Sequence, residues 1–455
     1  MTTVDFLRKI PLRRFSDYNP PDADTRVRSS LSRLLLEGSA ADIAIRIKDS
    51  FITPFALALK ASSFQIGLLT AVPFLIGALA QLLTSRLMYA AGSRKRFVLA
   101  VLLLSGVVWV PVALLPWIFD SAQVWWLLGL VTLGITTFQL PSPAWGSWIA
   151  QLLPVNRRGR FIGARATQAT LVGVLTVLGL GRLMDLMQNR VFVGFSMLFF
   201  GVALCRFLSF YLYSHVYDPP LPPRATTRGT GMRESLRGLF RTDLGRFMGI
   251  NAFFNFSCTL AGPFFTVLMI RDLGFSFTTF ILLQMVSAFS AMIGLQVWGR
   301  VADRLGNARI LHITVPLIGL VAMSWTINQT PAFLVLVHVM GGLVWSGYNV
   351  SSLNYALETS SDQERTRLVG MFNAFAGVGI FLGSLTGGLI APHVPQIFAY
   401  SILTLILISG ILRFGTGILL LIFVREVREG APSQTFRLRV PHPAFAVHHN
   451  TKRKP

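Results

Sequence analysis

Charged residues are scarce in this 455-residue sequence, where Asp, Glu, Lys and Arg together make up only 13%. A soluble globular domain carries about 25%, so the charged surface of such a domain is missing. Cysteine is rarer still: Cys205 and Cys258 are the two in the chain, which excludes a disulfide scaffold and a cysteine-rich metal framework. The sequence also lacks a phosphate-binding loop, an H-x-x-x-H pair and a nucleophile elbow. No enzyme, cofactor or metal site is therefore predicted.

Apolar residues dominate instead, at 53% of the sequence with a mean hydropathy of +0.60. They form blocks of about 20 residues, the length with which a helix crosses a bilayer. Helices are favoured over barrel strands because the blocks do not alternate polar and apolar residues. The twelve predicted spans are approximately 34–58, 64–88, 97–118, 124–150, 160–183, 191–214, 244–270, 276–299, 310–328, 332–356, 367–391 and 397–424.

Acidic residues are outnumbered, with 19 Asp and Glu against 41 Lys and Arg and a formal net charge of +22. In a soluble protein this excess would indicate a nucleic-acid partner. With the N-terminus placed in the cytoplasm, however, 33 basic residues fall on the cytoplasmic face, four on the opposite face and four within spans. This is the bias of a membrane protein. It predicts an inner (plasma) membrane protein with both termini cytoplasmic, with lipids rather than nucleic acid around it.

A long loop rich in proline and arginine divides the chain. We expect it to be a cytoplasmic linker, 215–243, between two six-helix halves, 34–214 and 244–424. A cytoplasmic tail, 1–33, precedes the first half, and a basic cytoplasmic tail, 425–455, follows the second. The basic C-terminal tail could bind a partner protein or anionic lipid.

The two halves repeat one another. Arg158-Gly-Arg160-Phe-Ile-Gly163 before the fifth span matches Arg365-Thr-Arg367-Leu-Val-Gly370 before the eleventh, at an offset of 207 residues. The same offset relates Arg206-Phe207 to Arg413-Phe414. An offset shared at two places indicates duplication. Duplicated six-helix halves are typical of transporters that bind their solute between the halves, near the bilayer midplane.

The loop between the eighth and ninth predicted spans contains Gly299, Asp303, Arg304, Gly306 and Arg309 in the spacing G-x-x-x-D-R-x-G-x-x-R. This resembles the signature cytoplasmic loop of the major facilitator superfamily. The resemblance implies the fold of that superfamily, an all-α integral membrane protein with twelve transmembrane helices in two pseudo-symmetric six-helix bundles. It also implies that these five residues form a gating loop at the inner surface.

The equivalent loop after the second span is degraded. It keeps Gly92 and a basic run, but Tyr89 and Ala90 stand where the acid and the first arginine belong, so the gating role is not carried across. Two other stretches, Glu37-Gly38 and the run from Pro143 to Arg160, resemble a little-characterised bacterial branch of the superfamily.

Charges gather unexpectedly in the first predicted span, which holds Glu37, Asp42, Arg46, Lys48 and Asp49. Each charge at the bilayer centre costs about 2.5–3.5 kcal/mol on insertion scales, so this helix must turn them inward. Asp42, Arg46 and Asp49 share one helical face, which predicts an acid–base–acid ladder. Arg46 is a candidate anion anchor, and Asp42 or Asp49 a candidate proton carrier. The alternative is a mutually neutralised cluster that only holds the helix in place.

Uncharged polar and aromatic residues complete the expected cavity. The superfamily lines its cavity with the first helix of each three-helix repeat, here spans 1, 4, 7 and 10. The candidates are Gln139, Trp145, Trp148, Asn251, Asn255, Trp345, Tyr348 and Asn349. Amides can hydrogen-bond a polar solute and rings can stack on it. Any one of them taken alone fits a helix–helix hydrogen bond or an interfacial aromatic equally well.

The sequence thus predicts a monomeric secondary active transporter that moves a small solute by alternating access, driven by a gradient, with the proton as the expected coupling ion. The alternative is a non-transporting receptor or assembly factor with the same fold, which the degraded first loop and the basic tail would suit. The identity of the solute and the direction of transport are not indicated.

Overall fold

The computed structural model describes residues 25–81, 83–153, 155–221, 243–358 and 365–426. Within these residues the secondary structure is helical, with no strand. We call residues 25–221 the N-terminal half and residues 243–426 the C-terminal half. Residues 222–242 of the expected linker and residues 427–455 of the expected basic tail lie outside the described residues.

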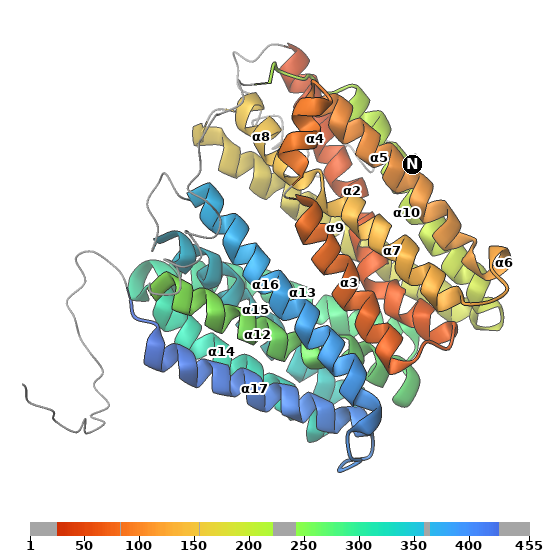
Figure 1. Ribbon diagram of the computed structural model, residues 1–455, viewed down its shortest axis with the longest axis vertical. Coiled ribbons are helices and arrows are strands. Elements are labelled where there is room, and N and C mark those ends of the chain that lie inside the picture. The colour runs from red at the N-terminus through yellow and green to blue at the C-terminus, as the bar shows by residue number, and fades with distance from the viewer. Residues whose placement is uncertain (1–24, 82, 154, 222–242, 359–364, 427–455) are drawn as a thin grey trace, which may run out of the picture.

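The N-terminal half contains α2 (Thr25–Ala58), α3 (Ser63–Gln81), α4 (Thr84–Ala90), α5 (Arg94–Ala113), α6 (Leu115–Ile118), α7 (Gln123–Gln139), α8 (Ser142–Leu152), α9 (Val155–Leu186) and α10 (Val191–Ser214). The C-terminal half contains α12 (Asp243–Val267) with a π-helical turn (Leu268–Asp272), α13 (Phe277–Leu305), α14 (Asn307–Met323), α15 (Pro331–Glu358), α16 (Arg365–Ile390) and α17 (Ser401–Phe423). Figure 1 shows the two halves as separate bundles of long helices.

In the described part of the chain, eleven helical segments are long and apolar enough to cross a membrane. The twelfth predicted span is α2, a helix of 34 residues whose charged residues lower its hydropathy. The prediction of an all-α fold with twelve spans is confirmed. Two predicted spans are each interrupted, however. The second span is divided into α3 and α4, and the fourth into α7 and α8. The first helix also starts at Thr25 rather than near residue 34, so residues 25–33 are its first turns and not part of a tail.

Each half packs its helices in the same way. In the N-terminal half α2 packs on α9 and α10, α5 packs on α10, and α7 packs on α3 and α5. In the C-terminal half the equivalent helices make the equivalent pairs: α12 with α16 and α17, α14 with α17, and α15 with α13 and α14. This shared pattern confirms the internal repeat that the 207-residue offset predicts.

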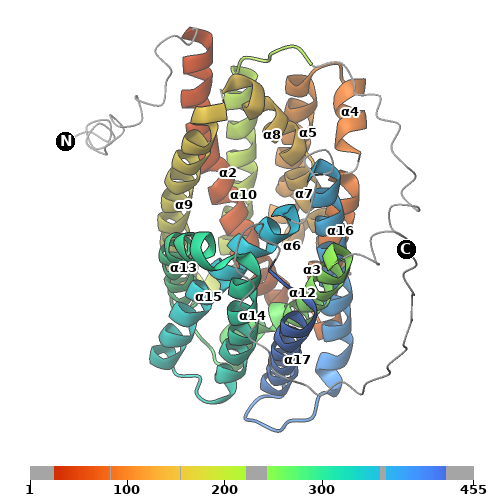
Figure 2. The same cartoon turned by 90° about the vertical axis from the view of Figure 1, so that its left-hand side faces the viewer.

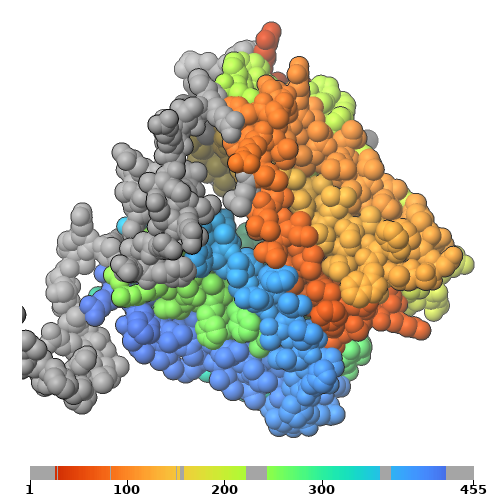
Figure 3. All heavy atoms as spheres, viewed as in Figure 1, coloured from red at the N-terminus to blue at the C-terminus, as the bar shows by residue number. Residues whose placement is uncertain are grey.

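The two halves meet along two equivalent helix pairs, α3 with α16 and α9 with α13. Figure 3 shows the side chains of α3 and α16 in contact along the middle of the molecule, and Figure 2 shows α9 above α13. Glycines bring the first pair together, because a Cβ on Gly67 would lie 2.6 Å from the Ser384 carbonyl oxygen and 2.9 Å from Gly388 Cα. The small residues Gly67, Ser384 and Gly388 therefore allow close packing of α3 on α16.

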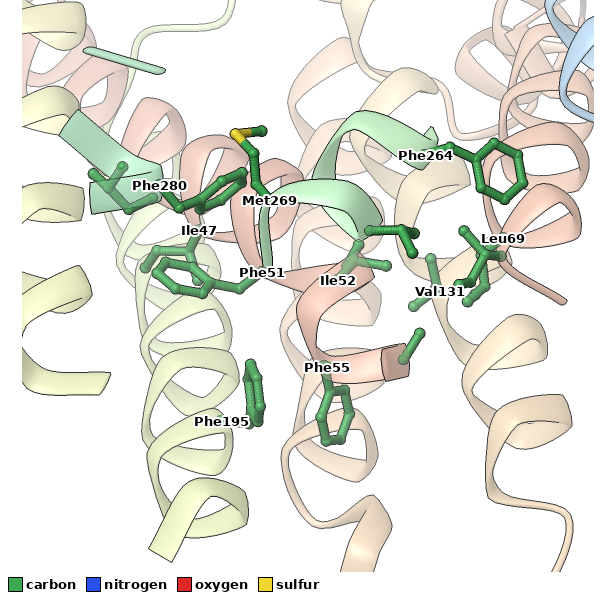
Figure 4. Packing of buried hydrophobic residues seen from close by; sticks show 14 of the residues in the cluster. Ile47, Phe51, Ile52, Phe55, Leu69, Val131, Phe195, Phe264, Met269 and Phe280 are labelled. Atoms are coloured by element: carbon green, nitrogen blue, oxygen red, sulfur yellow. The ribbon is translucent and has the colours of Figure 1, made fainter. Parts of the chain in front are cut away.

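One end of the molecule carries the α4–α5 and α13–α14 connections, and we call it the basic end because Arg94, Arg96 and Arg304 lie there. The other end, with the α2–α3 and α12–α13 connections, is called the far end. The largest hydrophobic core lies toward the far end and draws residues from both halves. Figure 4 shows Phe51 and Phe55 of α2 and Phe195 of α10 in the same cluster as Met269 and Phe280.

Toward the basic end the cores are separate. One cluster is built from residues between Val27 and Leu221, and another from residues between Leu244 and Val424. The two bundles therefore share a core at one end and keep their own cores at the other. Figure 1 shows the resulting divergence, with α8 and the start of α16 apart while α3 and α16 converge toward the far end.

Candidate functional site

Arg46 lies between the two halves. It borders a small cavity with Ser50 of α2, with Val174 and Val177 of α9, and with Gln284 of α13. The first two helices belong to the N-terminal half and α13 to the C-terminal half. Arg46 is thus the charged residue of the first helix that reaches the space from which a solute could contact both halves.

Arg46 is paired with Asp42 as its spacing predicts. The distance from Arg46 Nε to Asp42 Oδ2 is 2.5 Å, and each side chain keeps about a quarter of its surface exposed, 26% and 22%. Gly173 of α9 makes room for the pair, because a Cβ there would overlap Asp42 Oδ2 and lie 2.8 Å from Arg46 Nε. The pair is therefore held against α9 while part of it stays accessible, which a purely structural ion pair does not require.

Asp49 does not extend this pair into a ladder. Its carboxylate is bonded to Lys48, the adjacent residue. Lys48 is buried and its ammonium lies 5.7 Å from the centre of the Phe138 ring. A buried ammonium needs a counter-charge, and Asp49 supplies it. The prediction of an acid–base–acid ladder is wrong in this respect, since Asp42 alone pairs with Arg46.

Three of the predicted cavity residues form one hydrogen-bonded cluster in the C-terminal half. Tyr348 Oη donates to Asn251 Oδ1 at 2.7 Å, and Asn255 Nδ2 lies 3.4 Å from Tyr348 Oη and 2.8 Å from the Asn251 carbonyl oxygen. Asn251 Nδ2 is buried and has no hydrogen-bond partner among the described residues. Trp345 packs edge-on against Tyr348, with ring centres 5.6 Å apart. The cluster joins α12 to α15 and leaves one amide donor available.

Two further predicted residues lie elsewhere. Gln139 Oε1 accepts from Gln81 Nε2 at 3.3 Å, which is a bond between the ends of α7 and α3. Asn349 follows Tyr348 on α15 but is exposed, so it is not part of the asparagine–tyrosine cluster.

Trp148 is a core residue rather than a cavity residue. It is 1% exposed, its indole N–H donates to the Tyr217 carbonyl at 2.9 Å, and its ring packs on Tyr213. The sequence placed it in a continuous fourth span. In the structure that span breaks after α7, and α8 carries Trp148 into the core near the basic end.

Trp145, also on α8, belongs to a buried charge cluster that the sequence did not reveal. The guanidinium of Arg165 lies 4.9 Å from the Trp145 ring centre. The same guanidinium bonds Glu37 Oε2 at 2.7 Å and the Leu34 carbonyl at 3.0 Å. Glu37 is 4% exposed. Arg165 lies ten residues inside the 32-residue helix α9, and an arginine so far within a membrane span is a signal that the sequence offered.

The predicted gating loop presents most of its charged side chains at the surface of the described part of the chain. The side chains of Asp303, Arg304 and Arg309 are exposed, while Gly299 lies partly buried on α13. Gly306 ends α13 with a φ of +89°, in the region that favours glycine.

Glu426, which our sequence analysis did not single out, bonds this loop to the residues that follow α17. Its Oε2 accepts from the Ala308 N–H at 3.1 Å and so caps the start of α14. Asn307 Nδ2 adds a 2.8 Å bond to Glu358 Oε1. The loop is fixed to its own half.

One carboxylate links the two halves at the far end. Asp185, near the end of α9, accepts the backbone N–H of Phe277 at 2.7 Å and that of Thr278 at 2.9 Å. These two N–H groups begin α13, where the helix dipole favours an anion. A Cβ on the neighbouring Gly181 would lie 3.1 Å from Ile281 Cγ1, so the contact is close-packed.

Comparison with solved structures shows that several membrane transporters share this fold. The chain is similar to a bacterial homologue of the human lysosomal transporter Spinster in an inward-facing, unoccupied conformation, at TM-score 0.63 and 16% identity over 88% of this chain and 96% of the other. It is similar to the nucleoside transporter NupG, at TM-score 0.67 and 13% identity over 87% and 98%. It is also similar to the E. coli xylose transporter XylE in a partially occluded inward-open conformation, at TM-score 0.65 and 12% identity over 90% and 100%.

Residues 247–452 match the model of the Major Facilitator Superfamily. The N-terminal half repeats the packing of this matched half helix for helix. The C-terminal half therefore matches the Major Facilitator Superfamily, and the twelve spans make the chain a multi-pass membrane protein. No curated protein sequence matches the chain.

Proposed function

We propose that the protein is a secondary active transporter that moves a small solute by alternating access, and that the structure is its inward-open state, with the basic end in the cytoplasm and both termini inside. One observation carries this proposal. The halves share a hydrophobic core at the far end, whereas at the basic end each half has its own. Because the two halves diverge toward the basic end, we expect a solute to reach Arg46 from that end.

Rocking of the two halves against each other would close the basic end and open the far end. Two packed bundles that meet along pseudo-symmetric pairs, α3 with α16 and α9 with α13, can pivot about a site near their middle. Asp185 and the shared core are contacts that the opposite state would have to break. Asp303, Arg304 and Arg309, exposed here, are available to contact the N-terminal half in that state.

Arg46 is the proposed anchor for the solute, and Asp42 the proposed proton carrier. A solute anion that bound the Arg46 guanidinium would compete with Asp42, which is 2.5 Å away. Displacement of Asp42 from Arg46 by the solute would couple solute binding to the carboxylate that we propose as the proton carrier. Asp49 is a weaker candidate because Lys48 holds it. A monomer in the plasma membrane would suffice, since the site lies between two halves of one chain.

The test begins with a ligand. A thermal-shift screen of metabolites and drugs on the purified chain identifies molecules that bind the folded form. The radiolabelled hit is then followed into proteoliposomes, with and without an imposed pH gradient. Accumulation that follows the gradient, and counterflow against unlabelled hit, are the expected results. A hit that binds tightly but gives no flux would instead support the non-transporting receptor.

A further inference from the structure

A second arginine lies deep in the C-terminal half. Arg413, in the middle of α17, is 5% exposed. Its Nε donates to Ser409 Oγ at 3.1 Å and its Nη2 to the Cys258 carbonyl at 3.0 Å. No carboxylate of the described residues lies within ion-pair distance of it. An unpaired guanidinium at this depth is costly, and costly intramembrane charges usually mark function.

The equivalent arginine of the N-terminal half is in a different situation. Arg206 is also buried, at 4% exposed, and its Nε bonds Ser105 Oγ at 3.2 Å. Its guanidinium lies 4.2 Å from the centre of the Phe138 ring, and the carboxylate of Glu37 acts on it electrostatically. The repeat therefore placed an arginine in both halves, but only the N-terminal half supplies an acid nearby.

Arg413 borders a second cavity, which is lined by residues of the C-terminal half. This cavity, which we call the C-half chamber, has a volume of about 390 Å³ and lies among α12, α13, α14, α15 and α17. That volume falls within the range of sites for small organic molecules. The aromatic residues that line it are Phe265, Trp325 and Trp345, and polar lining residues include Gln284 and His338.

The wall of the chamber suits a ring or an aliphatic body. Phe265 and Trp325 pack edge to face, with ring centres 4.9 Å apart, and His338 packs on Trp325 at 5.5 Å. The chamber lies next to the space between the halves, because Gln284 lines both the chamber and the cavity that Arg46 borders.

We propose that the C-half chamber binds an amphipathic organic monocarboxylate, with its carboxylate on Arg413 and its apolar or aromatic body against Phe265, Trp325 and Trp345. The chemistry of the chamber selects this class. A planar guanidinium recognises a carboxylate through paired N–H···O bonds, the described residues offer no competing acid, and the remaining wall is mainly apolar. As an assignment of transported solute this rests on the proposed function, but the binding itself does not.

The test compares matched probes on the purified full-length chain in nanodiscs. Binding of 4-phenylbutyrate and of its neutral amide is measured by titration calorimetry and by quenching of tryptophan fluorescence. We expect the acid to bind at least 10-fold more tightly than the amide. The Arg413→Gln variant should abolish this preference, and Arg413→Lys should keep part of it. Arg206→Gln is the matched control, since it removes a buried arginine outside the chamber and should retain the preference.

A steric variant guards against loss of folding in the arginine variants. Gly262 of α12 lines the chamber, and a Cβ there meets nothing within 4 Å. Gly262→Leu should therefore fill the chamber and weaken phenylbutyrate binding at least 10-fold. Gly249→Leu on the same helix is its control, since a Cβ at Gly249 also meets nothing within 4 Å and Gly249 does not line the chamber.

The outcomes separate the two proposals. Failure of the wild-type chain to bind phenylbutyrate, equal binding of acid and amide, or unchanged preference in the Arg413→Gln variant would each overturn the chamber assignment. Binding that depends on Arg413 but is never followed by flux into proteoliposomes would uphold the chamber and refute the transporter. Flux of another solute that is unaffected by Gly262→Leu would uphold the transporter and refute the chamber as its route.

Discussion

Replacing Asp185 by alanine should shift the protein away from the conformation described here. The carboxylate of Asp185 accepts two backbone N–H groups at the start of α13, at 2.7 and 2.9 Å, and thereby joins the two halves at the far end. Hydrogen bonds to a charged group contribute about 1.5–3 kcal/mol each when buried. Asp185 is only partly buried, so we expect about 1–2 kcal/mol for both together after solvent screening.

This energy sets the size of the effect. Because each 1.4 kcal/mol changes an equilibrium constant by a factor of about 10, loss of the contact should move the ratio of the two conformations by about 5- to 30-fold toward the state that is open at the far end. Single-molecule energy transfer between dyes at Asn189 and Thr330, exposed far-end positions on opposite halves, measures this ratio directly in a background without the native cysteines.

The matched control removes a far-end carboxylate that has no hydrogen bond or ion pair to the C-terminal half among the described residues. Asp120 is exposed in the α6–α7 connection, and Asp120→Ala should leave the ratio unchanged. An Asp185→Ala variant with the same far-end distance distribution as the wild type would refute the reasoning, because the contact would then contribute nothing to the choice of conformation.

Three further predictions concern the site and the gating loop. Gly173→Leu should abolish transport without unfolding the protein, since a side chain there displaces the Asp42–Arg46 pair. Its control is Gly179→Leu on the same helix, which should transport normally because a Cβ there meets nothing within 4 Å. Equal activity of the two variants would contradict this prediction. Asp42→Asn should remove the dependence of accumulation on the pH gradient yet preserve counterflow, and a persistent gradient response would exclude Asp42 as the carrier. Glu426→Ala should lower the free energy of unfolding by about 1 kcal/mol through loss of the cap on α14, which a thermal melt of the variant checks.

Much of the fold could be predicted because the order of apolar blocks and charged loops along the sequence sets the number and orientation of the spans. The apolar blocks and the 207-residue offset required no knowledge of packing, and the structure reproduces both. The breaks that separate α4 from α3 and α8 from α7 could not be predicted in this way. The segment around Trp148 is apolar enough to continue a span, and only its packing against Tyr213 and Tyr217 shows that it belongs to the core near the basic end.

The candidate site was predicted where its residues lie on one helix and missed where they come from several. Asp42 and Arg46 are four residues apart on α2, so their pairing follows from helical geometry. The bond between Glu37 and Arg165 joins α2 to α9, and the unpaired state of Arg413 depends on which acids are absent around it. Both are properties of the assembled bundle. Asp49 shows where helical spacing alone misleads, because its carboxylate pairs with the adjacent Lys48 rather than with Arg46.

The most direct test of the transporter proposal follows both ends of the molecule at once. One dye pair reports the far end, at Asn189 and Thr330, and a second pair reports the basic end, at Ser142 of α8 and Asn354 of α15, which are both exposed. As ligand or pH is varied, alternating access predicts reciprocal change: whenever the basic-end distance shortens, the far-end distance lengthens. A far-end distance that stays fixed under every condition, or two distances that lengthen together, would contradict it.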